Sequence, residues 1–146
     1  QAAIAHNQFK RLDKLKKYRN INRNLIIKKL LTSKKWNNQF KFIVTPKNID
    51  PSWMGLPILV SEKYKNKKRK FINFLDQKGI ETRPIISGNF ANQPAAKLYK
   101  LNEKNIKFNN AQKIQDLGFL IGLHTRKISK SKLDFIHDVF FMIDHI

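Results

Sequence analysis

Residues 79–95 read GIETRPIISGNFANQPA, an apolar run followed directly by a polar turn that contains glycine. The run predicts a strand over residues 80–86, and Arg83 is biased towards an extended backbone because a proline follows it. Residues 87–90 predict a turn or loop. A proline also opens residues 94–99, where it suits the first position of a short helix. This stretch therefore predicts a chain in which strands and helices alternate.

The flanking residues predict further elements of both kinds. Apolar residues recur at three- and four-residue steps over residues 2–31, without glycine or proline, which favours one long helix. Pro57 indicates that the strand expected at residues 53–60 lies at a sheet edge or contains a bulge. Asn110 and Ser129 are expected to cap helices. Together these patterns predict an α+β fold in one domain over residues 1–146, with a small sheet covered by helices on one face. The remaining helices are expected at residues 63–78, 110–117 and after 129, and the remaining strands at 40–44, 53–60 and 118–123.

The charge of the chain is strongly positive. Thirty Lys and Arg residues against ten Asp and Glu residues give a formal net charge of +20, which attracts polyanions. The lysines are scattered among Asn- and Ile-rich segments such as 20–24 and 105–110, which favours solvated lysines over a dedicated nucleic-acid surface. Phe71, Phe74, Phe135 and Phe140 lie on expected core stripes, where stacking platforms would need exposure. A basic nucleic-acid-binding module remains the alternative, and the favoured interpretation predicts weak, nonspecific binding.

Several classes of site are excluded by composition. The chain has no cysteine, which excludes disulfides, thiolate zinc sites and a cysteine nucleophile and is compatible with a cytoplasmic protein. The four histidines show no metal-ligand spacing, and no glycine-rich phosphate loop occurs. No apolar run reaches membrane-spanning length, so no membrane partner is expected. Because the sequence begins at Gln1 inside an expected helix, we expect a fragment of a longer protein.

Two side chains in the quoted stretch suit a ligand. Arg83, on the expected strand, carries a planar fork that matches phosphate or carboxylate. Asn89, in the following turn, offers both a donor and an acceptor to a sugar hydroxyl. The alternative is an ordinary exposed arginine and a turn asparagine.

Four stretches, in the correct order, resemble the C-terminal part of the DegT-type sugar aminotransferases and dehydrases. The most specific is Thr82-Arg83-Pro84 with residues 87–90, which is similar to the nucleotide-sugar 3-dehydrase branch. The others are residues 1–4 leading into a long basic helix, residues 50–57 (DPSWMGLP), and residues 119–124 followed by Ile128-Ser129.

This resemblance implies the small C-terminal domain of a fold-type-I pyridoxal-phosphate enzyme that works as a homodimer on nucleotide-linked sugars. It implies pyridoxal phosphate or pyridoxamine phosphate in the full-length protein, with the catalytic lysine or histidine upstream of Gln1. No catalytic, cofactor or metal residue is therefore expected in this chain, and the fragment alone should bind no cofactor and be inactive. Arg83 and Asn89 are the first implied substrate contacts, and Ser87 and His124 are the next candidates. Residues 125–127 depart from the family pattern directly after His124. A non-catalytic interaction domain of the same fold is a third interpretation.

Overall fold

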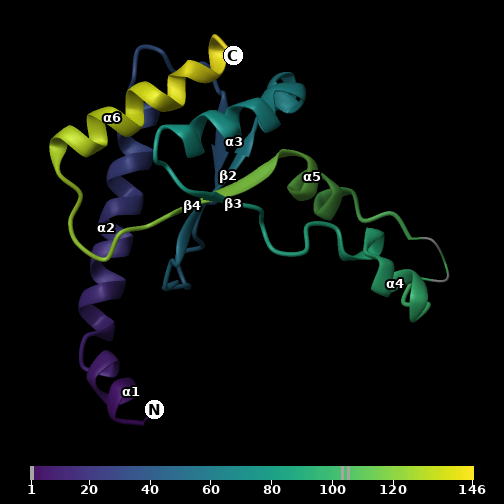
Figure 1. Ribbon diagram of the computed structural model, residues 1–146, viewed down its shortest axis with the longest axis horizontal. Helices are drawn as coiled ribbons and strands as arrows, with labels where there is room; N and C mark the ends of the chain where they lie inside the picture. Colours follow the sequence, from purple (N-terminus) through teal and green to yellow (C-terminus); the bar gives the residue numbers. More distant parts are fainter. Residues whose placement is uncertain (1, 103, 105) are drawn as a thin grey trace. The chain divides into compact units, whose positions relative to one another are not determined.

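The computed structural model describes residues 2–102, 104 and 106–146, so Gln1 and Asn105 lie outside the described residues (Figure 1). The chain forms two compact units. The first comprises residues 1–37, 44–56 and 122–145, and the second comprises residues 38–43, 57–121 and 146. Helices and a small sheet both occur, which confirms the predicted α+β class.

The first unit is built on two helices that pack side by side, α2 (Leu12–Leu31) and α6 (Lys130–Phe141) (Figure 1). Their contact is apolar, because Ile26 and Leu30 of α2 and Val139 and Phe140 of α6 are buried. Polar contacts also join the pair. Lys29 Nζ lies 2.6 Å from an Asp134 carboxylate oxygen, and His137 Nε2 lies 2.9 Å from Ser33 Oγ. The single-turn helix η3 (Met142–Asp144) follows α6.

The N-terminal helix differs from its prediction. It is divided at Lys10 and Arg11 into α1 (Ala2–Phe9) and α2, and α1 buries no residue. Phe9 is 74% exposed and Leu12 is 48% exposed, so the expected inward stripe is wrong for this end of the helix. The three- and four-residue spacing of the apolar residues did not indicate where the stripe ends. Whether such a residue is buried depends on whether another element packs against it.

The cap predicted for the last helix is correct, and one of its core positions is not. Ser129 Oγ accepts a hydrogen bond from the Lys132 backbone N–H at 3.3 Å, as an N-cap does. Phe135 is exposed, whereas Phe140 and Phe141 are buried. The prediction that Phe135 lies in the core was therefore wrong, and Phe141 was missed.

The sheet lies mainly in the second unit and has the strand order β1-β2-β4-β3. Its strands are β1 (Phe40–Phe42), β2 (Gly55–Val60), β3 (Thr82–Arg83) and β4 (Gly118–Gly122). The β1–β2 and β3–β4 pairs are antiparallel. Because β2 lies between β1 and β4, the predicted edge position of Pro57 was wrong. The predicted gap in the hydrogen-bond ladder is present. The pairing between β1 and β2 ends at Ile58, the residue next to Pro57.

Helix α3 (Lys68–Gln77) packs on this sheet and follows the 3-10 helix η1 (Glu62–Lys67). Phe71 is fully buried, with its ring centroid 5.7 Å from that of Phe40 and 6.1 Å from that of Phe119. The helix ends as predicted at Gly79, whose φ is +78°. There the Ile80 N–H donates to Leu75 O at 2.9 Å, which completes the helix-stop motif that glycine favours.

The remaining elements of the second unit are short. They are η2 (Phe90–Asn92), α4 (Pro94–Leu98) and α5 (Asn109–Leu117). The proline at the start of α4 confirms its predicted helix. The N-cap of α5 is Phe108, so the cap predicted at Asn110 was wrong. Strand β3 covers two residues of the expected seven. Pro84 has no N–H to extend the ladder to β4 after Arg83, and the Ile80 N–H before the strand is bonded to Leu75 O.

Candidate functional site

A cavity of about 470 Å³ lies in the second unit between α3, α5 and the segment that follows β3. Lys68, Arg83, Ser87 and Gln115 are among the side chains that line it. Its volume lies in the range of small-molecule sites, which is about 300–1,000 Å³. Two of the four predicted substrate residues, Arg83 and Ser87, therefore meet at one cavity.

Arg83 reaches this cavity from the end of β3, where it pairs with Leu120 of β4. Its side chain is 71% exposed, and one terminal nitrogen lies 2.6 Å from a Glu81 carboxylate oxygen. An exposed ion pair of this kind stabilises a fold by only about 0–1 kcal/mol. A stronger anion can therefore compete with Glu81 for the guanidinium at small cost.

The turn after β3 has an unusual backbone. Ser87 and Gly88 have φ values of +64° and +51°, in the left-handed region that a residue with a side chain rarely adopts. A Cβ atom at Gly88 would lie 3.0 Å from Cβ and Cγ of Gln115. Glycine is thus required here both by conformation and by the close approach of α5.

Asn89 is buried behind this turn, and the loop itself uses its amide. Its Oδ1 accepts from the Ala91 N–H at 3.2 Å, and its Nδ2 donates to Gln112 Oε1 at 3.0 Å. The side chain in this way caps η2 and ties it to α5. The structure gives Asn89 a role in shaping the loop, and its predicted contact with a sugar hydroxyl stays a prediction.

Lys68 supplies a second cation at the cavity, which sequence reasoning missed. Its Nζ donates to Gln115 O at 2.9 Å and to Gly118 O at 3.2 Å, at the end of α5. Burial lowers its pKa, because a charged ammonium loses hydration there, and the carboxylate of Asp116 opposes this shift. No local pattern distinguished Lys68 from the many other lysines, since its partners lie 47 and 50 residues further along the chain.

His124, the fourth predicted residue, belongs to the first unit. Its ring Nδ1 accepts from the Arg126 N–H at 3.0 Å, and its side chain is exposed. The surrounding loop is held by the buried Asn22 of α2, whose Nδ2 donates to the carbonyls of His124 and Arg126 at 2.8 and 2.7 Å. Asn22 Oδ1 also accepts from the Ile128 N–H at 2.9 Å.

The cavity does not suit pyridoxal phosphate as a complete site. Among its described lining residues there is no aromatic ring to stack on the pyridine and no carboxylate to pair with the ring nitrogen. Lys68 is the lysine in the described lining, and its ammonium is already bonded to two carbonyls. Among the residues that the structure describes, no group of three His, Cys, Asp or Glu side chains is arranged to hold a metal. The described helices also include none that is long and apolar enough to cross a membrane.

Solved structures with the same fold include two 3-dehydratases named for a GDP-linked 4-keto-6-deoxymannose. The E. coli GDP-4-keto-6-deoxy-D-mannose-3-dehydratase with bound hydrated PLP superimposes with a TM-score of 0.71 at 20% identity, over 94% of this chain and 33% of that one. A ColD variant with bound GDP-perosamine gives a TM-score of 0.75 at 22% identity, over 94% and 34% of the two chains. These matches confirm that the chain has the fold of part of a fold-type-I pyridoxal-phosphate enzyme.

Sequence comparison gives a consistent result. The lipopolysaccharide biosynthesis protein RfbH of Salmonella typhimurium (strain LT2) is 30% identical over 87 residues, which are 60% of this chain and 20% of that protein. The chain thus spans about a fifth of this curated relative and about a third of the solved ones. The model of the DegT/DnrJ/EryC1/StrS aminotransferase family matches residues 1–138. By this match over nearly its whole length, the chain belongs to the DegT/DnrJ/EryC1/StrS aminotransferase family.

Proposed function

We propose that this chain is the C-terminal, substrate-contacting part of an enzyme that acts on nucleotide-linked sugars with pyridoxal phosphate or pyridoxamine phosphate. The reaction is either 3-dehydration of a 4-keto-6-deoxyhexose or transamination of a sugar. The observation that carries the proposal is that Arg83 lines a cavity in a chain of this family. Arg83 stands on a short edge strand, which brings it to the cavity wall. RfbH, a lipopolysaccharide biosynthesis protein, and the GDP-perosamine complex of ColD supply the substrate class.

The residues of this chain bind and orient the substrate. The Arg83 guanidinium binds a phosphate oxygen through charge-assisted hydrogen bonds, and the ammonium of Lys68 adds positive charge on the same cavity. In this proposal the hydroxyl of Ser87, which lines the cavity, bonds a sugar or phosphate oxygen. The cofactor, when bound, supplies the electron sink for chemistry at the sugar. The cavity lining does not fit that cofactor, so we place its anchoring residues in parts of the enzyme outside this chain. The proposal further takes the complete enzyme to be a cytoplasmic homodimer.

The test is a titration of the chain with a GDP-linked hexose, followed by amide shifts in NMR spectra. The expected result is saturable shifts at residues 82–93, with affinity reduced about tenfold or more by Arg83→Ala, since a charged hydrogen bond contributes about 1.5–3 kcal/mol. Arg69→Ala is the matched control, because this exposed arginine lies on α3 beside Lys68 and does not line the cavity. Equal effects of the two substitutions, or shifts spread over surface lysines, would contradict the proposal.

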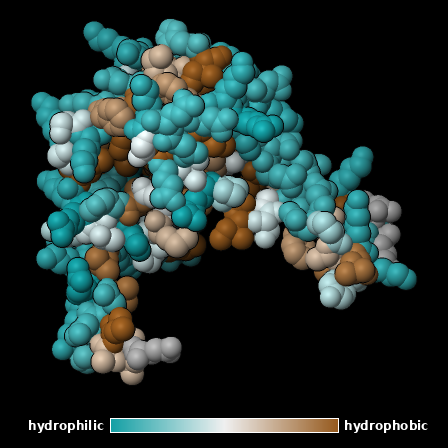
Figure 2. Space-filling view, viewed as in Figure 1, coloured by the Kyte–Doolittle hydropathy of each residue, from teal (hydrophilic) through white to brown (hydrophobic). Residues whose placement is uncertain are grey.

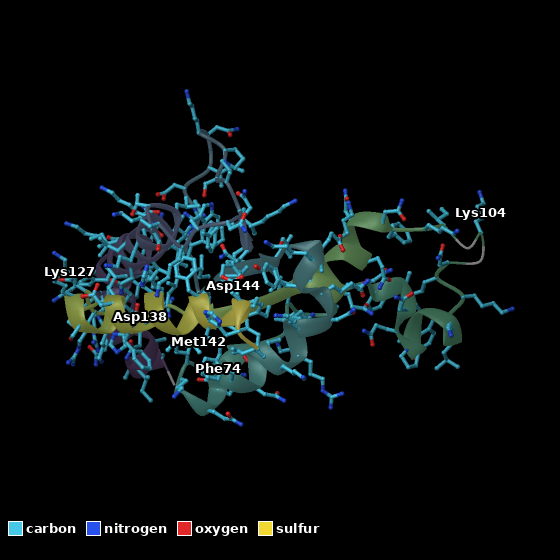
Figure 3. The ribbon with its side chains drawn as sticks, turned by 90° about the horizontal axis from the view of Figure 1, so that it is seen from above. Phe74, Lys104, Lys127, Asp138, Met142 and Asp144 are labelled. Carbon is cyan, nitrogen blue, oxygen red and sulfur yellow. The ribbon has the colours of Figure 1, made fainter. Side chains whose placement is uncertain are left out.

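The nucleic-acid alternative is not favoured. Phe71 and Phe140 are buried, and Phe71 packs against other aromatic rings instead of offering a stacking surface. Figure 3 shows side chains with nitrogen tips in many parts of the described chain, including Lys104 between α4 and α5 and Lys127 before α6. We expect weak binding to nucleic acid without sequence preference, falling steeply between low and physiological salt. Tight, sequence-selective binding in a filter assay at physiological salt would reverse this preference.

A further inference from the structure

We propose that Gln112 and Gln115 of α5 are positioning residues for the ligand-binding turn, and that they hold residues 87–92 in the shape that forms the cavity. The inference rests on the proposed function, because it assigns these two side chains to the same site. Neither glutamine is part of the predicted substrate contacts. They lie three residues apart, so both fall on one side of α5.

Gln115 connects two parts of the cavity wall. Its side-chain Oε1 accepts from the Asn89 backbone N–H at 3.0 Å. Its backbone carbonyl accepts from Lys68 Nζ at 2.9 Å, and its Cβ and Cγ lie 3.0 Å from where a Cβ atom at Gly88 would be. One residue thus contacts the turn and the second cation of the cavity.

Gln112 holds the next part of the same loop. Its Oε1 accepts from Asn89 Nδ2 at 3.0 Å and from Asn92 Nδ2 at 2.8 Å. Its Nε2 donates to Asp116 Oδ1 at 2.8 Å, and Asp116 in turn lies 2.7 Å from Lys65 Nζ. The hydrogen bond from Lys65, and then that from Gln112, lower the pKa of Asp116, which keeps the carboxylate ionised as the acceptor for Gln112.

The loop depends on these contacts because the sheet does not hold it, and its own backbone bonds, such as Gly88 N–H to Ile85 O and Asn92 N–H to Asn89 O, are local turn bonds. The β3–β4 ladder reaches Arg83 and does not continue past Pro84, and Ser87 and Gly88 then adopt left-handed conformations. Asn89 is buried, so the loss of an α5 acceptor would leave its N–H without water to replace that acceptor. The turn would then open locally while the rest of the unit stays folded.

The experiment compares Gln115→Met, Gln115→Glu and Gln77→Met in this chain. Methionine keeps the length of the side chain and removes the acceptor, whereas glutamate keeps the acceptor. Gln77 is an exposed glutamine at the end of α3 and serves as the matched control. The readouts are hydrogen exchange of the Asn89 amide by NMR, affinity for a GDP-linked hexose, and Tm.

We expect Gln115→Met to raise the Asn89 exchange rate about tenfold or more and to weaken the affinity five- to tenfold, with Tm changed by only a few degrees. Gln115→Glu should keep the exchange protection, and Gln77→Met should change none of the three readouts. Unchanged exchange in Gln115→Met would overturn the inference, and so would faster exchange with unchanged affinity. If the unsubstituted chain binds no GDP-linked hexose, the proposed function fails and the positioning role fails with it. If that chain binds and Gln115→Met binds equally well, only the inference fails.

Discussion

In the second unit, α3 and residues 84–102 are held by different kinds of interaction. Phe71 and Leu75 of α3 are fully buried, and Phe71 packs against aromatic rings of β1 and β4. Residues 84–102 instead leave Ile86 81% exposed and Leu98 74% exposed, and Figure 2 shows apolar side chains at the surface of the α4 segment. Amide and backbone hydrogen bonds, many of them to α5, hold this second region. Apolar burial therefore supports the scaffold, and polar bonds set the geometry of the site.

The largest expected effect is on the scaffold. Phe71→Ala should lower the free energy of unfolding by about 3–5 kcal/mol, because it removes a fully buried ring and leaves a cavity. Denaturant unfolding measures this change. Phe74→Ala on the same helix is the control and should cost clearly less, because Phe74 is only partly buried. Equal losses for the two variants would show that burial against the sheet does not control the stability of this unit.

A functional effect without a stability effect is expected at Arg83. In the complete enzyme, Arg83→Ala should lower kcat/KM about ten- to hundredfold, because a charge-assisted bond of about 1.5–3 kcal/mol is lost. Arg83→Lys should restore part of the activity, since it keeps the charge and loses the fork. Steady-state kinetics and Tm are the measurements. A lower Tm with unchanged kcat/KM would make Arg83 a structural residue.

At the turn itself, Gly88→Ala should cost about 1–2 kcal/mol of local stability, because a left-handed conformation disfavours alanine and the new methyl group meets Gln115. Hydrogen exchange of residues 87–92 reports the change. Gly122→Ala is the control, since a Cβ there would meet no atom within 4 Å. Comparable exchange in the two variants would contradict the strained turn.

The smallest expected effect is the pH dependence carried by Asp116. Its pKa in the folded chain lies below the usual 3.8, chiefly through the hydrogen bond from Lys65, so its ionised form stabilises the fold. This contribution is complete above about pH 4 and is lost as pH falls through the lower, folded pKa. The Tm difference between the wild-type chain and Asp116→Asn should therefore shrink on acidification through that range. A difference independent of pH would show that the charge of Asp116 contributes nothing.

Local signals in the sequence were sufficient for much of the fold. The stop at Gly79, the cap at Ser129 and the short helix opened by a proline each depend on a few neighbouring residues, and all three were correct. The strand conformation of Arg83 was predicted for the same reason, because the proline that follows it favours an extended backbone, and Arg83 is the last residue of β3. The burial of the N-terminal helix was not predictable, because it depends on which residues pack against it.

The site was harder to predict because its contacts join distant residues. Gln112 and Gln115 lie 23 and 26 residues beyond Asn89, and the signal available was only their three-residue spacing on an expected helix. Asn22 binds a loop more than 100 residues away, which no local pattern indicates. Asn89 was chosen for its hydrogen-bonding groups, yet those groups also suit a structural bond, and the sequence does not distinguish the two uses.

The short outer strands of the sheet affect how the chain behaves at high concentration. A sheet edge with a long row of unpaired N–H and C=O groups can pair with another chain and begin aggregation. Here the outer strands β1 and β3 have three and two residues, and a proline follows β3 directly. Each edge thus offers too few groups for an added strand to gain much, and the net charge of +20 repels a second copy. Pro84, which ends the strand directly after Arg83, therefore also limits strand addition at this edge.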